Sequence, residues 1–185
     1  MIDEILEDAN ERMGKSIESM QQAFAKIRTG RANPALLDTI TVDYYGNATP
    51  LNQVASIGVE DGRTLTVSPW EKPLVPDIEK AILKSDLGIT PVSAGDVIRV
   101  PLPPLTEENR RDLARLAKQE AENGRIAIRN IRRDAISDIR DLVKEKEATE
   151  DDARRAEERI QAFTDARVAE VDGALSAKEA DLMEI

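Results

Sequence analysis

All nine prolines of this 185-residue chain lie between Pro34 and Pro104. A proline inside a helix removes a backbone hydrogen bond and clashes with the preceding turn, which costs about 3 kcal/mol. The chain on either side of this window can therefore form long, uninterrupted helices. The only tryptophan and both tyrosines also fall inside the window. This shift predicts a separate domain, residues 31–104, inserted into a helical domain made of residues 1–30 and 105–185.

Three stretches outside the proline window carry apolar residues at steps of three and four, the spacing of one helix face. The first covers residues 2 to about 29, and the second begins at Thr106. The third begins at Thr149, which forms the pattern of a capping box with Asp152. The apolar stripe of the second helix consists of Leu113, Leu116, Ala117, Ala121, Ile128, Ile131, Ala135, Ile139 and Leu142. Three stripes that each need a partner predict a three-helix bundle.

Gly124 lies in the middle of the second predicted helix, where glycine costs about 1 kcal/mol relative to alanine. Close packing against another helix would explain a residue without a side chain at this point. The sequence leaves the role of Gly124 open.

Inside the proline window the apolar residues alternate with polar ones, the pattern of a half-buried strand. Strands are predicted near residues 40–44, 65–67 and 98–102, and a short helix is predicted from Pro76 to Leu87. Turns are predicted at Tyr45-Gly46-Asn47 and Asp61-Gly62. Trp70 is expected in the core of this domain. The sequence thus predicts an α+β fold, a long three-helix bundle interrupted by a small β/α/β domain.

The chain crosses between the two predicted domains at residues 29–31 and 102–105. Gly30 permits bending at the first crossing, and Pro103 with Pro104 favours an extended backbone at the second. Two adjacent covalent links allow limited relative motion, which is typical of a hinge. The predicted hinge residues are Gly30, Arg31, Pro103, Pro104 and Leu105.

The chain has a formal net charge of −10, yet one segment of the second helix is strongly basic. Between Asn109 and Arg133 eight Lys or Arg residues face three acids, a local net charge of +5. Four of the cations recur every seventh position on one helix face with little acid between them: Arg111, Lys118, Arg125 and Arg132. In an acidic protein such a face indicates a polyanion, most commonly a nucleic acid, whereas a merely solvated face would mix both charges.

The sequence has no cysteine and no histidine, which removes thiolate metal sites and the commonest general base. Gly14-Lys15-Ser16 resembles the end of a phosphate-binding loop, but Ala9 stands where that loop needs a glycine. We expect no catalytic residue, no metal and no cofactor, in a cytoplasmic protein. Two alternatives stay open. One is an adaptor whose basic helix meets an acidic protein, and the less favoured one is an enzyme that uses Lys, Asp or Ser.

Five segments of the chain form a recognisable set. They are KIRTGRANP at residues 26–34, SAG at 93–95, VPLPPLTEE at 100–108, RNIRRDA at 129–135 and KEADLM at 178–183. In this order, and at this chain length, they resemble the bacterial ribosome recycling factor family. Asn109 and Gly124 depart from the residues usual in that family.

The resemblance implies two domains in an L shape similar in outline to a transfer RNA. It also implies a monomer without a small-molecule substrate or a membrane. Such a protein binds the post-termination ribosome through large-subunit ribosomal RNA and, with elongation factor G and GTP hydrolysis, splits the ribosome into subunits. The family arginine most closely tied to ribosome binding matches Arg132, supported by Arg129, Arg110, Arg28 and Arg31. The basic face adds Arg133, Arg125, Arg111 and Lys118 to the predicted RNA-binding set.

Overall fold

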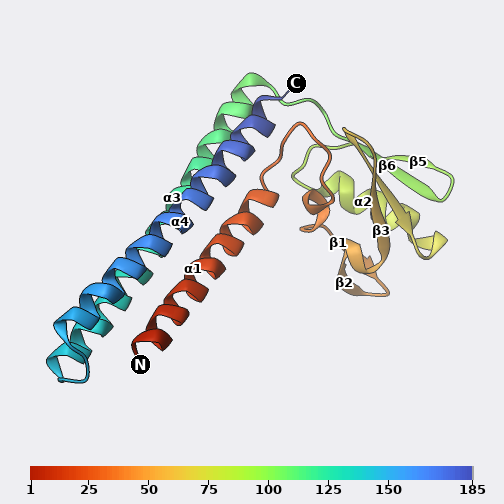
Figure 1. Cartoon of the computed structure of the whole chain (residues 1–185). Coiled ribbons are helices and arrows are strands. Elements are labelled where there is room, and N and C mark those ends of the chain that lie inside the picture. The colour runs from red at the N-terminus through yellow and green to blue at the C-terminus, as the bar shows by residue number, and fades with distance from the viewer. Residues whose placement is uncertain (185) are drawn as a thin grey trace. The chain divides into compact units, whose positions relative to one another are not determined.

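The structure is a computed structural model that describes residues 1–184. The chain forms two compact units, and Figure 1 shows the elements of each. The bundle unit consists of Met1–Phe24 and Ala114–Ala180, and the sheet unit consists of Ala25–Leu113 together with the residues from Asp181 onward. Both predicted hinge segments lie within the sheet unit. The domain boundaries predicted from the sequence stay a prediction.

Three long helices supply the bundle unit, as the sequence predicts: α1 (Ile2–Ala25), α3 (Glu107–Lys144) and α4 (Glu150–Met183). The first helix ends one turn earlier than expected, because the amide of Asn33 donates to the carbonyl oxygen of Ala25. The capping box of α4 is confirmed. The backbone N–H of Asp152 donates to Thr149 Oγ1 at 3.1 Å, and the N–H of Thr149 donates to Asp152 Oδ2 at 3.2 Å.

The bundle core follows the apolar stripes of the helices. Its fully buried members include Met13, Ala117, Ala121, Ile128, Ile139, Ile160 and Val171. The assignment of Leu116 to the buried stripe is wrong, because its side chain is 46% exposed while its neighbour Ala117 is buried. Adjacent helical residues lie about 100° apart, so the narrow stripe that buries Ala117 leaves Leu116 on its flank.

Gly124 is buried where α3 packs against α1. A Cβ atom at this position would lie 3.3 Å from Sδ of Met20 and 3.7 Å from Met20 Cβ. The structure thus gives the reason for the glycine, which is the close approach of Met20 on α1.

The sheet unit contains two antiparallel sheets. A hairpin pairs β1 (Thr41–Tyr44) with β2 (Asn47–Pro50). The second sheet has the order β3-β4-β6-β5 and contains β3 (Ala55–Asp61), β4 (Thr64–Pro69), β5 (Val92–Ala94) and β6 (Val97–Pro101). Tyr45 and Gly46 have φ values of 50° and 83°. Positive φ at both central residues is typical of a tight hairpin turn, which confirms the turn predicted here.

The core of the sheet unit combines strands, the short helix α2 (Val75–Lys84) and neighbouring loops. Its fully buried members include Leu37, Leu51, Leu65, Val67, Ile78, Ile82, Ile98 and Val100. The prediction for Trp70 is wrong, because its side chain is 67% exposed. The alternation that buries Leu65 and Val67 in β4 directs the residue at position 70 to the opposite face. No helix within residues 1–184 is long and apolar enough to span a membrane.

Candidate nucleic-acid interface

The nine predicted RNA-binding residues divide between the two units. Five of them lie on the part of α3 that belongs to the bundle unit: Lys118, Arg125, Arg129, Arg132 and Arg133. The other four belong to the sheet unit: Arg28, Arg31, Arg110 and Arg111. A single rigid helix therefore positions the larger group.

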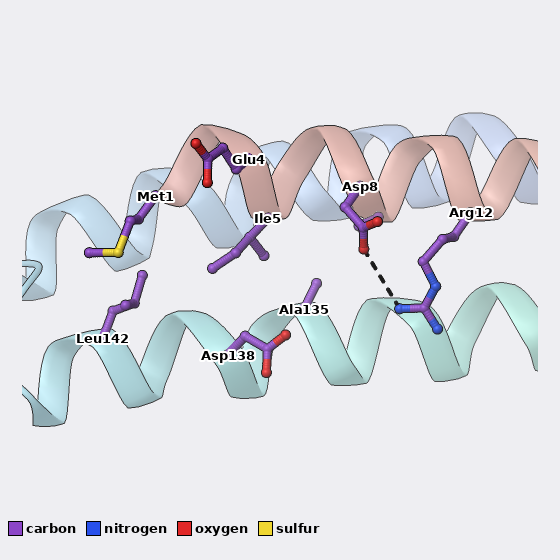
Figure 2. Close-up of a pocket in the computed structure, with 9 residues that line it drawn as sticks. Met1, Glu4, Ile5, Asp8, Arg12, Ala135, Asp138 and Leu142 are labelled. Carbon is purple, nitrogen blue, oxygen red and sulfur yellow. Dashed lines mark ion pairs between the residues drawn. The ribbon is translucent and has the colours of Figure 1, made fainter.

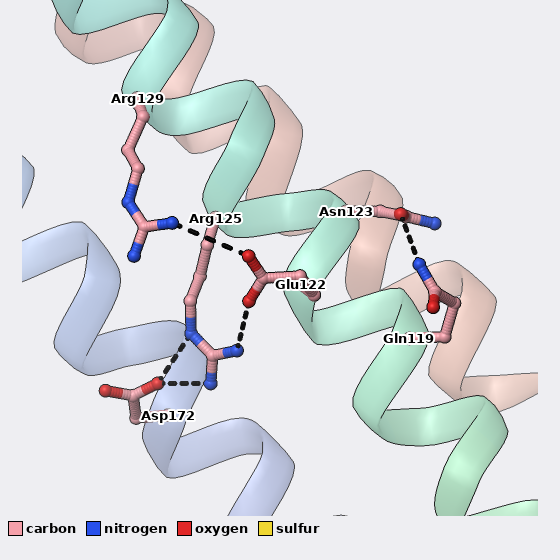
Figure 3. A network of polar contacts seen from close by, with 6 residues as sticks. All are labelled: Gln119, Glu122, Asn123, Arg125, Arg129 and Asp172. Carbon is pink, nitrogen blue, oxygen red and sulfur yellow. Dashed lines mark hydrogen bonds and ion pairs between the residues drawn. The ribbon is translucent and has the colours of Figure 1, made fainter.

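Arg125 is an enclosed cation of α3, with a side chain only 18% exposed (Figure 3). Its Nε and one terminal nitrogen donate to Asp172 Oδ1 on α4, at 2.9 and 2.5 Å, and the other terminal nitrogen lies 3.1 Å from Glu122. The hydrogen bond to Asp172, followed by the one to Glu122, raises the pKa of Arg125. With two carboxylate partners, this guanidinium serves mainly to join α3 to α4.

Glu122 also pairs with Arg129, whose terminal nitrogen lies 3.5 Å from the carboxylate (Figure 3). This contact is looser, since the side chain of Arg129 is 54% exposed. One turn from the start of α3, Arg111 pairs with Glu107 at 2.7 Å. The expectation of an acid-poor face therefore does not hold for this half of the helix.

Arg132 has a different environment. Its Nε donates to Oε1 of Gln161 on α4 at 2.8 Å, and the amide nitrogen of Gln161 donates to Asp165 at 2.7 Å. The amide orients the guanidinium without neutralising it, because the direct partner carries no charge. Among the described residues Arg132 has no acidic partner. The terminal N–H groups of Arg132 thus keep their capacity for a bidentate contact with phosphate.

The anchoring residues Gln161 and Asp172 were not identified from the sequence. Both residues lie on α4. Gln161 is 29 positions from Arg132, and Asp172 is 47 positions from Arg125. The helical period marks which face of α3 is polar, but it carries no information about the register of α4 against α3. Only the packed bundle shows which arginines are oriented and which are neutralised.

The arginines of the sheet unit are engaged with their own unit. A terminal nitrogen of Arg28 donates to the carbonyl oxygen of Pro103, and burial lowers the pKa of Arg28. Arg31 forms an ion pair with Glu184. The Nε atoms of Arg28 and Arg110 are buried and have no hydrogen-bond partner. The contact between Arg28 and Pro103 joins the two chain crossings that the sequence predicts as hinge segments.

Nothing in the described part of the chain resembles a metal centre, since no three carboxylates are grouped so that they could hold an ion. The chemistry on the surface of α3 is instead that of oriented and exposed guanidinium groups. Such groups bind phosphate oxygens.

Comparison with known proteins identifies the family. Residues 20–183 match the family described as ribosome recycling factor. The chain belongs to the ribosome recycling factor family. The family consists of translation factors that are not enzymes. The ribosome-recycling factor of Marinomonas sp. is 61% identical over the full length of both chains. That of Nitrosococcus oceani is 62% identical and covers 100% of this chain and 99% of the relative.

Solved structures of ribosome recycling factors share the fold. A solution structure of a ribosome recycling factor is 38% identical, with a TM-score of 0.76 over 100% of this chain and 98% of that one. The T. thermophilus ribosome recycling factor, in a structure with E. coli elongation factor G bound to the E. coli post-termination complex, is 44% identical. Its TM-score is 0.69, and both chains are covered completely. The α+β fold with long helices and a small β domain is thereby shown for this chain.

Proposed function

We propose that this chain binds the post-termination ribosome through large-subunit ribosomal RNA and, with elongation factor G and GTP hydrolysis, promotes its splitting into subunits. The observation that carries the RNA contact is the position of Arg132. A neutral amide orients its guanidinium on a helix of an acidic protein, and no carboxylate among residues 1–184 pairs with it. Membership of the ribosome recycling factor family supports the ribosome as the target. Since ribosomes are its site of action, we place the monomeric protein in the cytoplasm.

The binding surface has a centre and a periphery. Arg132 and Arg129 form the centre, because the first is oriented without being neutralised and the second is loosely paired. Arg133 and Lys118 add exposed charge. Arg125 contributes mainly by holding α3 against α4. In the sheet unit, Arg28, Arg31, Arg110 and Arg111 are proposed as a second group of RNA contacts.

The test of the RNA contact is the double substitution Arg129→Ala with Arg132→Ala. Loss of two phosphate contacts should reduce the slope of log affinity against log salt by about 1.4–1.8. The midpoint of thermal unfolding should change little, because Arg129 has only a half-exposed ion pair. Affinity is measured by ribosome pelleting at several salt concentrations.

A matched control removes two exposed arginines of α4, Arg155→Ala with Arg159→Ala. Their partners are Asp152 and Asp3, so the charge change is equal but lies away from the proposed RNA contacts. If the Arg129/Arg132 variant binds ribosomes as tightly as this control, the α3 surface does not contact RNA. A salt dependence too shallow for counterion release from nucleic acid would instead favour an adaptor function.

Motion at the two chain crossings is the second part of the proposal. The supporting features are Gly30 at one crossing, Pro103 and Pro104 at the other, and the hydrogen bond from Arg28 to Pro103. Substituting Gly30→Pro restricts the backbone where bending is proposed. The variant should bind ribosomes normally and split them slowly in light scattering with elongation factor G and GTP. Circular dichroism verifies its fold, and normal splitting by a folded variant would remove the mechanical role of this crossing.

A further inference from the structure

A hollow of about 470 Å³ lies on the C-terminal part of α3, and it extends from Arg132 and Arg133 to residues not yet assigned to RNA binding. Its lining consists of Arg132, Arg133, Ile136, Ser137, Arg140, Asp141 and Lys144. Four cations face one acid in this lining, a local net charge of +3. A concave, cationic surface on an acidic chain attracts anions, and its concavity concentrates the field.

The cations of this hollow are less neutralised than those in the first half of α3. Arg133 and Lys144 are exposed and form no ion pair within the part of the chain that the structure describes. Arg140 is paired through its Nε with Glu157 at 3.2 Å, and its side chain remains 66% exposed. In contrast, Arg125 has two carboxylate partners and is 18% exposed. Charge is therefore more available at the C-terminal end of the helix.

Helix geometry aligns these groups in a row. Arg133, Arg140 and Lys144 follow each other at steps of seven and four, which places them on one helix face. The rise of about 1.5 Å per residue separates Arg133 from Lys144 by ~16 Å. Ser137 lies between the cations and contributes a hydroxyl donor to the lining. A row of donors of this length fits several consecutive phosphates of a nucleic-acid strand better than one small anion.

A second hollow of the bundle unit has the opposite charge. It lies between α1 and α3, has a volume of about 330 Å³ and is lined by Glu4, Asp8 and Asp138 with one cation, Arg12 (Figure 2). A terminal nitrogen of Arg12 lies 3.9 Å from Oδ2 of Asp8, so the charge of Arg12 is partly neutralised within the lining. The bundle thus separates positive and negative charge between two hollows, and only the one at Arg132–Lys144 suits a polyanion.

We propose that the hollow formed by Arg133, Ser137, Arg140 and Lys144 is a second RNA phosphate site. It would extend the contact from Arg132 toward the turn between α3 and α4. The inference rests on the proposed function, since Arg132 lines the hollow and also lies at the centre of the RNA surface. An RNA strand that contacts Arg132 would continue directly into the hollow. Guanidinium groups and a hydroxyl are suited to phosphate oxygens.

The test uses the full chain with Arg133→Gln and Lys144→Gln, and with Lys144→Gln alone, because Arg133 already belongs to the proposed RNA surface. Neither side chain has an ion pair in the described structure, so the double variant should fold normally, as its unfolding midpoint would verify. Loss of two phosphate contacts should reduce the salt slope of binding to isolated large ribosomal subunits by about 1.4–1.8. At ~0.1 M salt the affinity should fall on the order of tenfold. The matched control is Arg155→Gln with Arg159→Gln, which removes the same charge elsewhere on the bundle.

Hydroxyl-radical footprinting of the ribosomal RNA identifies the ligand. The wild-type protein should protect a stretch of backbone that the Arg133/Lys144 variant leaves exposed. An affinity and slope equal to those of the control would overturn the second site. A loss of affinity with an unchanged RNA footprint would also overturn it, because the ligand of the hollow would then be an acidic protein. If only Arg129/Arg132 substitutions weaken binding, the second site fails while the proposed function stands. If the wild-type protein itself shows no salt-dependent binding, both fail.

Discussion

The bundle unit and the sheet unit build their cores in different ways. In the bundle, buried residues such as Met13, Ile128 and Ile160 lie on three different helices, α1, α3 and α4, and follow the apolar stripe of each. In the sheet unit, one cluster gathers residues from β1, β3, β4 and β6, from α2 and from loops between Leu36 and Leu102. The bundle therefore offers long, regular outer faces for charge. The sheet unit has a compact core that depends on contacts between distant parts of the sequence.

The largest effect on stability should come from replacing a buried side chain by alanine in the core of each unit. Leu65→Ala in the sheet unit and Ile128→Ala in the bundle both remove fully buried side chains, and each should lower the free energy of unfolding by about 2–5 kcal/mol. Trp70 lies in the sheet unit and the long helices dominate the far-ultraviolet circular dichroism. Leu65→Ala should therefore shift the fluorescence transition more, and Ile128→Ala the dichroism transition more. Equal shifts by both probes for both variants would show that the units unfold as one.

A glycine-to-alanine substitution should have opposite effects in the two units. Gly88 in the sheet unit has a φ of 64°, so alanine there should cost about 1–2 kcal/mol. Gly173 lies inside α4 with open space around a Cβ, and alanine there should stabilise the bundle by about 1 kcal/mol. Urea unfolding of the two variants measures the difference. Stabilisation by Gly88→Ala would contradict the left-handed backbone at that turn.

Gly124 sharpens this contrast within the bundle. Alanine there gains the same helix propensity as at Gly173, but its Cβ forces Met20 to move by a few tenths of an ångström. Because methionine is flexible, Gly124→Ala should be less stabilising than Gly173→Ala by several tenths of a kcal/mol. A gain equal to that of Gly173→Ala, measured in the same urea series, would show that the packing of α1 on α3 tolerates a methyl group.

The smallest effects concern pH, and they again separate the units. In the sheet unit, Tyr44 and Tyr45 donate to the two oxygens of Glu71 at 3.1 Å, and these hydrogen bonds raise the pKa of both hydroxyls. This stabilisation is complete below the unfolded value of about 10 and is lost as the pH rises through the folded pKa. Ultraviolet titration of tyrosinate should show a higher pKa in the wild-type protein than in Glu71→Gln. Identical titrations would exclude the contact.

In the bundle, a titratable contact is lost in acid instead. The side-chain hydrogen bond of Thr149 to Asp152, followed by the one from the Thr149 backbone N–H and the one from Arg155, lowers the pKa of Asp152. Its contribution is present above the unfolded value of about 3.9 and is lost as the pH falls through the lowered folded pKa. Dichroism of the wild-type protein and of Asp152→Asn should therefore converge in stability at low pH. A difference that persists unchanged into acid would show that the carboxylate charge is not involved.

The sequence predicted the parts of this protein that depend on local order. The restriction of proline to one window, the helical spacing of apolar residues and the capping pattern at Thr149 all act within a few residues along the chain. They indicated the three helices, the inserted β-containing segment and the start of α4, which the structure confirms. The errors at Trp70 and Leu116 arose where burial depends on which flank of an element meets another one.

The state of each arginine was decided only by the tertiary structure. The sequence by itself determined that positive charge gathers on one helix of an acidic chain. The packing of α4 on α3 decided that Asp172 neutralises Arg125, that Gln161 orients Arg132, and that the hollow ending at Lys144 stays open. The physical reason is that a helical period specifies direction around one axis. Which carboxylate or amide stands opposite depends on the register of a second helix, which no local pattern encodes.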